Sequence, residues 1–522
     1  MNRRTCLILG IVFVISLFVR LIGFRENVYF GFDEARDAFT SQEIYTKGDL
    51  KLIGPPAGSG AGIFHGPLYW YLVGPVYLVA KGNPEIVALI FKLINALAVI
   101  PIYLIATSLF TPQVGIMSAI VFAFSFEQNQ YASYVGNPTL ALYPILMLFG
   151  SVALLIGKKI DTNKSLLLMV AGAAIATQLN LMYVYLFAVI GALVFFFRKE
   201  FKLESKAVIR SVFLGGVILS TYILAEVRGN FSRIKQVLNL FRLGYNEGEP
   251  LIQRIGAYLE KCGWMVRDNI FTFSGNQMIF VLIFGLIAGL FVVKSMKSPG
   301  FKLLLVWVFA WVLLLPLGVH RGYYATLGLS VGLIIGISAV LIESWKKGNK
   351  LIVSILLIVV FLSNIFSILE QNGNSLILPL KPQPMMKLAD ELRLIDIMYK
   401  TAEGSGFTVR LVGIPFRVQT VWAYLFRQYG QEKYGYLPFW EYGNVGEYPG
   451  RMPIPIEGTS CKRFLVIEPT RGLPINLIES AAVEESYFSK RVDSKYVGDF
   501  FIEERLAYDK NCHETQGELI NP

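Results

Sequence analysis

A series of long apolar runs, separated by short polar connections, constrains this chain more than any other feature. A helix needs about 20 mostly apolar residues to cross the hydrocarbon core of a bilayer. The segments that approach this length are 6–24, 86–110, 113–127, 138–157, 165–179, 181–197, 207–226, 276–295, 301–319, 323–343 and 350–369. Soluble domains have roughly a quarter charged residues, whereas this chain has 16%. The sequence therefore predicts a mostly α, polytopic helical membrane protein with about eleven spans.

Basic residues occur at every second connection between these runs, and they predict the orientation. The basic residues at these positions are Arg3, Arg4, Lys158, Lys159, Lys164, Arg198, Lys199, Lys202, Lys206, Lys294, Lys297, Lys302, Lys346, Lys347 and Lys350. Because cytoplasmic loops are enriched in Lys and Arg, we expect a multi-pass protein of the plasma (inner) membrane with its N-terminus in the cytoplasm. Residues 25–85, 128–137, 227–275, the turn at 320 and everything after 370 then lie outside. The net charge of +11 reflects these loops, so we expect no nucleic-acid partner.

Two apolar segments need separate interpretation. The N-terminal run has no small-x-small cleavage site and is long, so we expect an uncleaved first span. If LYWYLVGPVYLVA (68–80) crossed the membrane, every later basic loop would move outside. This segment also contains Gly74 and Pro75. It is therefore predicted to form a re-entrant or interfacial helix.

Beyond residue 370 the apolar runs shorten to strand length. FTVRLVGIP and CKRFLVIEP predict strands, whereas 384–400 and VWAYLFRQYG predict helices. We expect two domains, a transmembrane domain over 1–371 with a long first outer loop (25–85) and a small extracytoplasmic α/β domain over 372–522. Cys461 and Cys512 are both in the second domain and are able to pair if it lies outside the cytoplasm.

The most informative polar motif is FGFDEARDAF, in which Asp33 and Glu34 follow the first span. Acids near bilayer depth tend to line polar cavities, and an adjacent pair supplies one carboxylate as a base and another to position it. Alternatively, Asp33 caps the N-terminus of a surface helix over 33–45, and Glu34 favours the helix dipole. Both interpretations are open, and they are compatible.

Further candidates lie at the other outer connections. His65 in FHGPLYWYL is suited to bind a phosphate or a sugar, or belongs to an aromatic belt around the short helix. Glu127 and Asn137 flank the second outer connection and either face a polar cavity or, for Asn137-Pro138, start a helix. His320 and Arg321 lie in a late outer turn, where a guanidinium is suited to hold a lipid phosphate or simply reaches the interface.

The order of these motifs resembles the protein O-mannosyltransferase and lipid A aminoarabinose transferase superfamily, the GT-C type of membrane glycosyltransferase. The matching signs are Asp33 and Glu34 after the first span, the GPLYWYL run, Lys92 early in the next span, and His320 and Arg321 with the following tyrosines. The resemblance covers roughly residues 1–370. It implies transfer of a hexosyl or pentosyl group from a polyprenyl-phosphate donor in an outward-facing cavity.

The resemblance also implies roles for individual residues. Asp33 is expected to deprotonate an acceptor hydroxyl, with inversion at the anomeric carbon, and Glu34 is its catalytic partner. His65, Lys92, His320 and Arg321 are candidates for binding the lipid phosphate. Two departures from the family are His65-Gly66, where a Lys is common before Pro-Leu-Tyr, and Asn137, where many members have an acid. Because Asn137 cannot ionise, either Glu127 substitutes for it or the second acid is absent, and we therefore predict no metal site. We also expect no cofactor.

Two other functional classes remain as alternatives. A transporter or flippase of lipid-linked glycans usually has repeated halves and charges near the midplane, whereas this sequence has no evident repeat. A non-catalytic scaffold is the other alternative. The expected partners are the lipid-linked sugar donor, a glycan, lipid or protein acceptor, and the bilayer.

Overall fold

The computed structural model of the protein describes most of the chain. The described residues are 3–57, 62–232, 234–236, 250–272, 275–317, 326–372, 383, 385–441, 448–454, 460–469, 473–510, 512 and 516. The chain divides into two compact units, and each unit contains segments from both halves of the sequence. The first unit comprises 1–22, 50–71 and 90–370, and the second comprises 23–49, 72–89 and 371–522.

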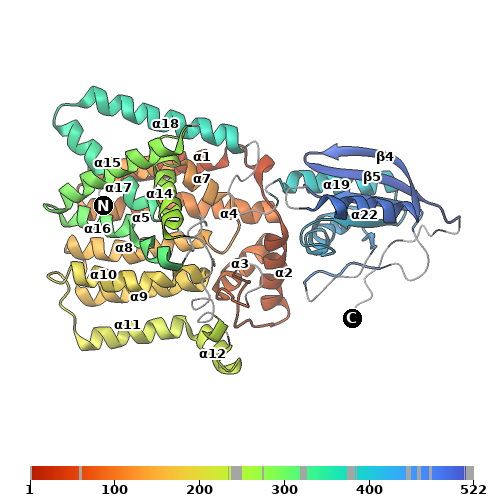
Figure 1. Ribbon diagram of the computed structural model, residues 1–522, viewed down its shortest axis with the longest axis horizontal. Helices are drawn as coiled ribbons and strands as arrows, with labels where there is room; N and C mark the ends of the chain where they lie inside the picture. Colours follow the sequence, from red (N-terminus) through yellow and green to blue (C-terminus); the bar gives the residue numbers. More distant parts are fainter. Residues whose placement is uncertain are drawn as a thin grey trace. The chain divides into compact units, whose positions relative to one another are not determined.

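The first unit is helical. Its helices are α1 (Arg3–Leu21), α4 (Pro84–Leu97, from residue 90), α5 (Val99–Leu109), α6 (Pro112–Phe124), α7 (Phe126–Ala132), η2 (Thr139–Ala141), α8 (Leu142–Ile156), α9 (Thr162–Leu179), η3 (Leu181–Tyr185), α10 (Leu186–Phe196), α11 (Ser205–Ile218), α12 (Ser220–Arg228), α14 (Leu251–Arg267), α15 (Gln277–Ser295), α16 (Pro299–Val308), η4 (Ala310–Leu317), α17 (Ser330–Lys346) and α18 (Lys350–Asn372). Helices α8, α9, α10 and α11 lie side by side (Figure 1).

The lengths and compositions of these helices identify a membrane protein. Among the described residues, 5 helices are long and apolar enough to cross a membrane, or up to 6 if the bent pair α11 and α12 is one span. The five helices are Arg3–Leu21, Pro84–Leu109, Thr139–Ile156, Gln277–Ser295 and Lys350–Glu370. Each segment predicted to span contains a helix, but several of these helices are shorter than a bilayer requires. The prediction of about eleven spans is therefore not confirmed as a count.

Two elements of the first unit position polar side chains. Helix α6 ends at Phe124, and the hydroxyl of Ser125 then caps α7 by accepting a hydrogen bond from the backbone nitrogen of Gln128 at 3.2 Å. Helix α7 is therefore a separate short helix, and its polar residues are buried rather than exposed. Helix α14 lies within 227–275, a stretch that the sequence placed outside the membrane and for which it predicted no particular helix.

The second unit combines helices with one sheet. Its helices are η1 (Arg25–Asn27), α2 (Phe32–Thr46), α3 (Leu68–Val79, from residue 72), the start of α4, α19 (Leu388–Ala402), α20 (Thr420–Leu425), η6 (Phe426–Gln431), α21 (Glu432–Tyr434) and α22 (Ile475–Ser486). Its strands are β1 (Phe407–Val412), β2 (Phe439–Trp440), β3 (Lys462–Ile467), β4 (Ser489–Val497) and β5 (Phe500–Ala507). These elements confirm the predicted strands at 407–415 and 461–469 and the predicted helices at 33–45, 384–400 and 421–430.

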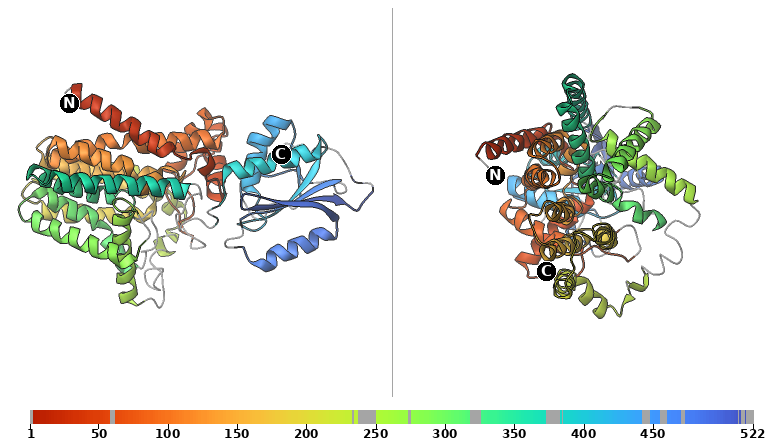
Figure 2. Two further views of the ribbon diagram at one scale, coloured as in Figure 1. Left: turned by 90° about the horizontal axis from the view of Figure 1, so that it is seen from above. Right: turned by 90° about the vertical axis from the view of Figure 1, so that its left-hand side faces the viewer.

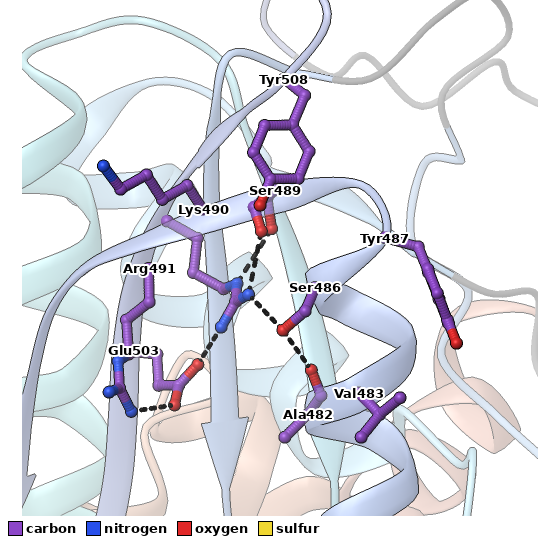
Figure 3. A pocket seen from close by; sticks show the side chains of 10 residues that line it. Ala482, Val483, Ser486, Tyr487, Ser489, Lys490, Arg491, Glu503 and Tyr508 are labelled. Carbon is purple, nitrogen blue, oxygen red and sulfur yellow. Dashed lines mark hydrogen bonds and ion pairs between the residues drawn. The ribbon is translucent and has the colours of Figure 1, made fainter.

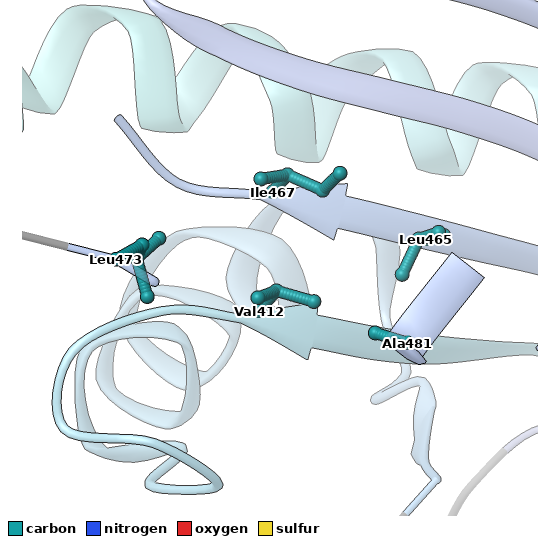
Figure 4. Close-up of a cluster of buried hydrophobic side chains, with 5 residues drawn as sticks. All are labelled: Val412, Leu465, Ile467, Leu473 and Ala481. Carbon is teal, nitrogen blue, oxygen red and sulfur yellow. The ribbon is translucent and has the colours of Figure 1, made fainter. Parts of the chain in front are cut away.

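The sheet is mixed and has the strand order β2-β1-β3-β5-β4. Strands β1 and β3 are parallel and nearly all buried, as expected for central strands covered on both faces. Figure 2 shows α22 on one face of the sheet and α19 on the other. Under α22, a core of apolar side chains joins the helix to the two central strands (Figure 4). Its members are Val412, Leu465, Ile467, Leu473 and Ala481.

A disulfide closes the C-terminal part of this unit. Cys461 precedes β3 and is bonded to Cys512, 51 residues later. The two remaining cysteines, Cys6 and Cys262, are free thiols. The pairing that the sequence left open is therefore present in the structure.

Candidate active site

The start of α2 separates the roles of the two adjacent acids. Gly31 is the N-cap of α2, so the interpretation of Asp33 as the cap is wrong. Asp33 is instead the second residue of the helix, and Glu34 the third. The Oε2 atom of Glu34 accepts a hydrogen bond from the backbone nitrogen of Gly31 at 3.2 Å, which is half of a capping box. Glu34 thus fixes the backbone from which the Asp33 side chain projects.

Three acids lie in the first turns of α2, and only Asp33 is exposed. The Asp33 side chain has 57% of its surface exposed, whereas Glu34 and Asp37 are buried. Arg36 lies between Asp33 and Asp37, with Nη1 at 2.7 Å from Oδ1 of Asp33 and Nη2 at 2.8 Å from Oδ1 of Asp37. Among the described residues, none donates a hydrogen bond to Oδ2 of Asp33. The arrangement therefore holds Oδ1 of an exposed carboxylate in place by one ion pair.

A short antiparallel link connects this motif to the C-terminal segment. Tyr29 forms an isolated β-bridge with Lys387. The backbone nitrogen of Phe30 donates to the Met386 carbonyl at 3.1 Å, and that of Leu388 donates to the Val28 carbonyl at 2.9 Å. Helices α2 and α19 both begin directly after this link. The position of Asp33 therefore depends on residues more than 350 positions away in the sequence.

Glu391, in the first turn of α19, is a buried acid that no motif in the sequence marks. Its side chain is completely buried, and neither carboxyl oxygen has a hydrogen-bond partner. Burial raises the pKa of Glu391 well above its ordinary value, and the charges of Glu468, Glu34 and Asp390 raise it further. In the sequence, Asp390 and Glu391 looked like ordinary acids at a helix start, and no local signal marks the burial of the second.

His65 is held by the start of η3, within the first unit. Its Nδ1 atom accepts a hydrogen bond from the backbone nitrogen of Leu181 at 3.0 Å. An accepting Nδ1 places the proton of the neutral imidazole on Nε2, which makes Nε2 a donor. The next residue, Gly66, lies so close to Gln178 that an added Cβ would be 1.9 Å from its Oε1 atom. A glycine is required there, and it fixes where the imidazole is placed.

Two cations are buried in the first unit. Arg20 is completely buried, and its Nε donates to Oδ1 of Asn95 at 2.6 Å. Its Nη1 donates to Oγ of Ser16 at 2.7 Å, while Nη2 has no hydrogen-bond partner. Lys92 has 2% of its surface exposed and donates to Oγ of Ser133 at 2.7 Å. Among the described residues, no carboxylate forms an ion pair with Arg20. A buried guanidinium without an acid is unusual, because burying a charge is costly unless it is paired.

Glu127, the other candidate acid, belongs to a closed hydrogen-bond network around α7. Its Oε2 atom accepts from Nδ2 of Asn269 at 2.8 Å, and Ser125 donates to the other end of the same amide at 2.6 Å. The backbone nitrogen of Phe126 donates to Oδ1 of Asn364 at 2.8 Å. This network joins α7 to α14, α17 and α18.

The remaining candidates are distributed as follows. Asn137 donates from Nδ2 to the Leu179 carbonyl at 2.8 Å and so ties the connection after α7 to the end of α9. His320 and Arg321 lie outside the described residues. Asp33 and Glu34 belong to the second unit, whereas His65, Lys92, Glu127 and Asn137 belong to the first. Among the described residues, no group of three or more His, Cys, Asp or Glu side chains is placed to hold a metal ion.

Comparisons with known proteins identify the fold. One similar structure is the oligosaccharyltransferase AglB from the archaeon Archaeoglobus fulgidus, solved with an inhibitory peptide and a dolichol-phosphate. The alignment covers 95% of this chain and 74% of the AglB chain, with a TM-score of 0.50 and 11% sequence identity. A second similar structure is the arabinofuranosyltransferase AftD from Mycobacteria. The alignment covers 98% of this chain and 40% of the AftD chain, with a TM-score of 0.50 and 14% sequence identity. Both are GT-C glycosyltransferases.

The chain has a GT-C fold. ArnT from Cupriavidus metallidurans, bound to undecaprenyl phosphate, also aligns, over 95% of this chain and 97% of its own, with a TM-score of 0.46 and 11% identity. The chain spans 60% of the length of another A. fulgidus oligosaccharyltransferase chain and 40% of that of AftD. No protein-family model matches the sequence, and no curated protein sequence matches it. The GT-C fold therefore agrees with the resemblance stated from the motifs.

Proposed function

We propose that this protein transfers a sugar from a polyprenyl-phosphate donor to an acceptor hydroxyl at the outer face of the membrane, with inversion at the anomeric carbon. The GT-C fold supports a glycosyltransferase, and one structure of similar fold, AglB, was solved with a dolichol-phosphate. In this proposal the donor sugar is a hexose or a pentose, and the acceptor is a glycan, lipid or protein.

The proposal includes a topology of about eleven spans in the plasma (inner) membrane. The N-terminus is cytoplasmic, residues 1–371 form the transferase domain, and residues 372–522 form an extracytoplasmic domain. The alternating basic connections support this orientation. The disulfide between Cys461 and Cys512 supports it independently, because disulfides persist mainly in oxidising compartments.

The observation that carries the proposal is the placement of Asp33. Arg36 holds its Oδ1 atom at 2.7 Å, and the side chain as a whole has 57% of its surface exposed. In the proposed step, this carboxylate takes the proton of the acceptor hydroxyl while the hydroxyl oxygen bonds to the anomeric carbon. The bond between that carbon and the phosphate oxygen breaks, and polyprenyl phosphate leaves with the electron pair. Glu34 positions the base through the helix start.

The departing phosphate needs cations or hydrogen-bond donors nearby. Lys92 and Arg20 are buried cations in the first unit, and Nη2 of Arg20 has no partner there. His65 presents an Nε2 donor because its Nδ1 accepts from Leu181. We assign Lys92 and His65 to phosphate binding, and we propose the same role for His320 and Arg321. Glu127 and Asn137 support this site by holding α7 and the following connection.

A turnover assay tests the assignment of Asp33. The purified protein in lipid nanodiscs is incubated with undecaprenyl-phosphate-linked hexoses and pentoses, and release of undecaprenyl phosphate is measured. The wild type is expected to release it with at least one donor. Asp33→Asn keeps the shape of the side chain but removes the base, and is expected to lower the rate at least about 100-fold.

Glu43→Gln is the matched control. Glu43 is an acid on the same helix, paired at the surface with Lys47 at 3.0 Å, and its replacement is expected to leave release unchanged. Normal release by Asp33→Asn would show that the assigned base is wrong. If lipid-linked sugars cross the bilayer without release of the lipid phosphate, the protein is a flippase rather than a transferase.

A further inference from the structure

A surface pocket in the C-terminal sheet has no part in the proposed transfer step. It lies where the end of α22 meets the edge strand β4 and its neighbour β5, and its volume is about 620 Å³. Its lining residues are Ala482, Val483, Ser486, Tyr487, Ser489, Lys490, Arg491, Glu503, Arg505 and Tyr508. Figure 3 shows the polar side chains of this group gathered in one place.

The floor of this pocket is a fixed hydrogen-bond network. Arg505 is almost completely buried, and its guanidinium donates to Oγ of Ser486 and Oγ of Ser489, each at 2.9 Å. Glu503 is buried beside it and forms ion pairs with Arg505 and, at 3.2 Å, with Arg491. Because its donors and acceptors are already oriented, the floor requires little reordering when a polar ligand binds.

Two exposed tyrosines border the pocket. Tyr487 has 75% and Tyr508 has 59% of its surface exposed. They stand at two different edges of the group in Figure 3. The backbone nitrogen of Tyr508 donates to the Phe488 carbonyl at 3.0 Å, which fixes that edge. Rigid aromatic rings beside polar groups offer an apolar face and a polar edge in one place.

The charge of the lining is positive. Three of its side chains are cationic (Lys490, Arg491 and Arg505), and one is anionic (Glu503). Lys490 is exposed and has no ion-pair partner within the described part of the chain, so its ammonium group is available to a ligand. A ligand that matches this pocket has ring faces, hydroxyl groups and at least one negative charge.

We propose that this pocket binds an acidic carbohydrate, a glycan segment that contains uronic acid residues. The C–H faces of sugar rings contact Tyr487 and Tyr508, sugar hydroxyls meet the polar floor, and a carboxylate pairs with Lys490 and Arg491. If the transferase proposal holds, such a glycan is a candidate acceptor, and acidic carbohydrates are then the chemical class of the acceptor. Binding itself does not depend on transfer.

Binding is measured on the full-length protein in nanodiscs by calorimetry, with a tetragalacturonate as the probe and no lipid donor present. We expect saturable binding that weakens as salt rises. Tyr508→Ala and Tyr487→Ala are each expected to weaken binding at least about fivefold, as for a central aromatic contact. Lys490→Gln is expected to weaken it about two- to fivefold, because the lost pair is exposed.

The matched controls are a tyrosine and a lysine on strand β4 that lie outside the pocket. Tyr496 is an exposed tyrosine and Lys495 an exposed lysine of β4, and neither lines the pocket. Tyr496→Ala and Lys495→Gln are expected to bind as the wild type does. Asp33→Asn is also expected to bind normally, which separates failure of this proposal from failure of the transferase proposal.

Three results would overturn the inference. The first is no binding of tetragalacturonate, or binding that Tyr487→Ala and Tyr508→Ala leave unchanged. The second is equal affinity for the neutral maltotetraose, which would contradict the charge argument. The third is equal, tyrosine-dependent binding of hexaglutamate, which would indicate an acidic peptide rather than a carbohydrate.

Discussion

The carboxylate of Glu127 accepts a hydrogen bond of 2.8 Å from the side-chain amide of Asn269, 142 residues further along the chain. The contact fixes α7 against the end of α14, and both groups are buried. Glu127 therefore joins the short helix α7 to the residues that follow α14 within the helical unit.

We predict that Glu34→Ala slows transfer, whereas Glu34→Gln largely preserves it. Both glutamate and glutamine at this position are able to accept from the backbone nitrogen of Gly31, which alanine cannot do. Loss of a helix cap destabilises by about 1 kcal/mol, and here it also frees the turn that holds Asp33. Turnover and thermal unfolding of both variants provide the measurement. Equal rates for the two would show that Glu34 does not act through the cap.

We predict that Lys92→Met weakens binding of undecaprenyl phosphate about tenfold without destabilising the protein. A buried charge replaced by an apolar side chain of similar volume is often neutral or stabilising. Ser133 keeps a partner, because its hydroxyl also contacts the Asn129 carbonyl at 3.1 Å. Lipid titration and thermal unfolding of the same sample separate the two effects. Lys164→Met, at an exposed position, is the control. Unchanged lipid affinity in Lys92→Met would remove Lys92 from the phosphate site.

We predict that Cys461→Ser lowers the unfolding free energy of the C-terminal unit by about 2–4 kcal/mol. The disulfide closes a loop over a separation of 51 residues, which restricts the unfolded chain. Alkylation under denaturing, non-reducing conditions, read by mass spectrometry, is expected to modify Cys6 and Cys262 and to leave the other two cysteines unmodified. Labelling of all four without reductant would show that the bond does not form in the cell.

Much of the helical architecture was predictable because it follows from local composition. A helix is predictable from an apolar run such as 350–369 alone, because a lipid-facing helix forms all its backbone hydrogen bonds within itself. The short strands Phe407–Val412 and Lys462–Ile467 were likewise evident from their β-branched and aromatic residues. Helix α14 was missed because its apolar residues are mixed with Arg254, Lys261 and Arg267, and so it resembled a polar loop.

The candidate site was only partly predictable. The sequence marked Asp33 and Glu34 as a pair but did not distinguish them. Adjacent residues of a helix point in different directions, and the sequence does not show which of these directions faces the protein interior. It also gave no sign that Arg20 lacks an acid partner or that Glu391 is buried without a hydrogen bond. Burial of a polar group depends on which distant elements pack over it.

The sequence by itself determined that this chain enters the membrane, where its apolar helices lie, and that acids follow the first of them. Those properties are local, since they depend on side-chain hydrophobicity and on the spacing of charges along the chain. Only the tertiary structure decided that Asp33 is exposed while Glu34 is buried, that Tyr29 pairs with Lys387, and that Cys461 meets Cys512. Each of these depends on packing between residues far apart in the chain, and no local pattern specifies which distant segment will be the neighbour.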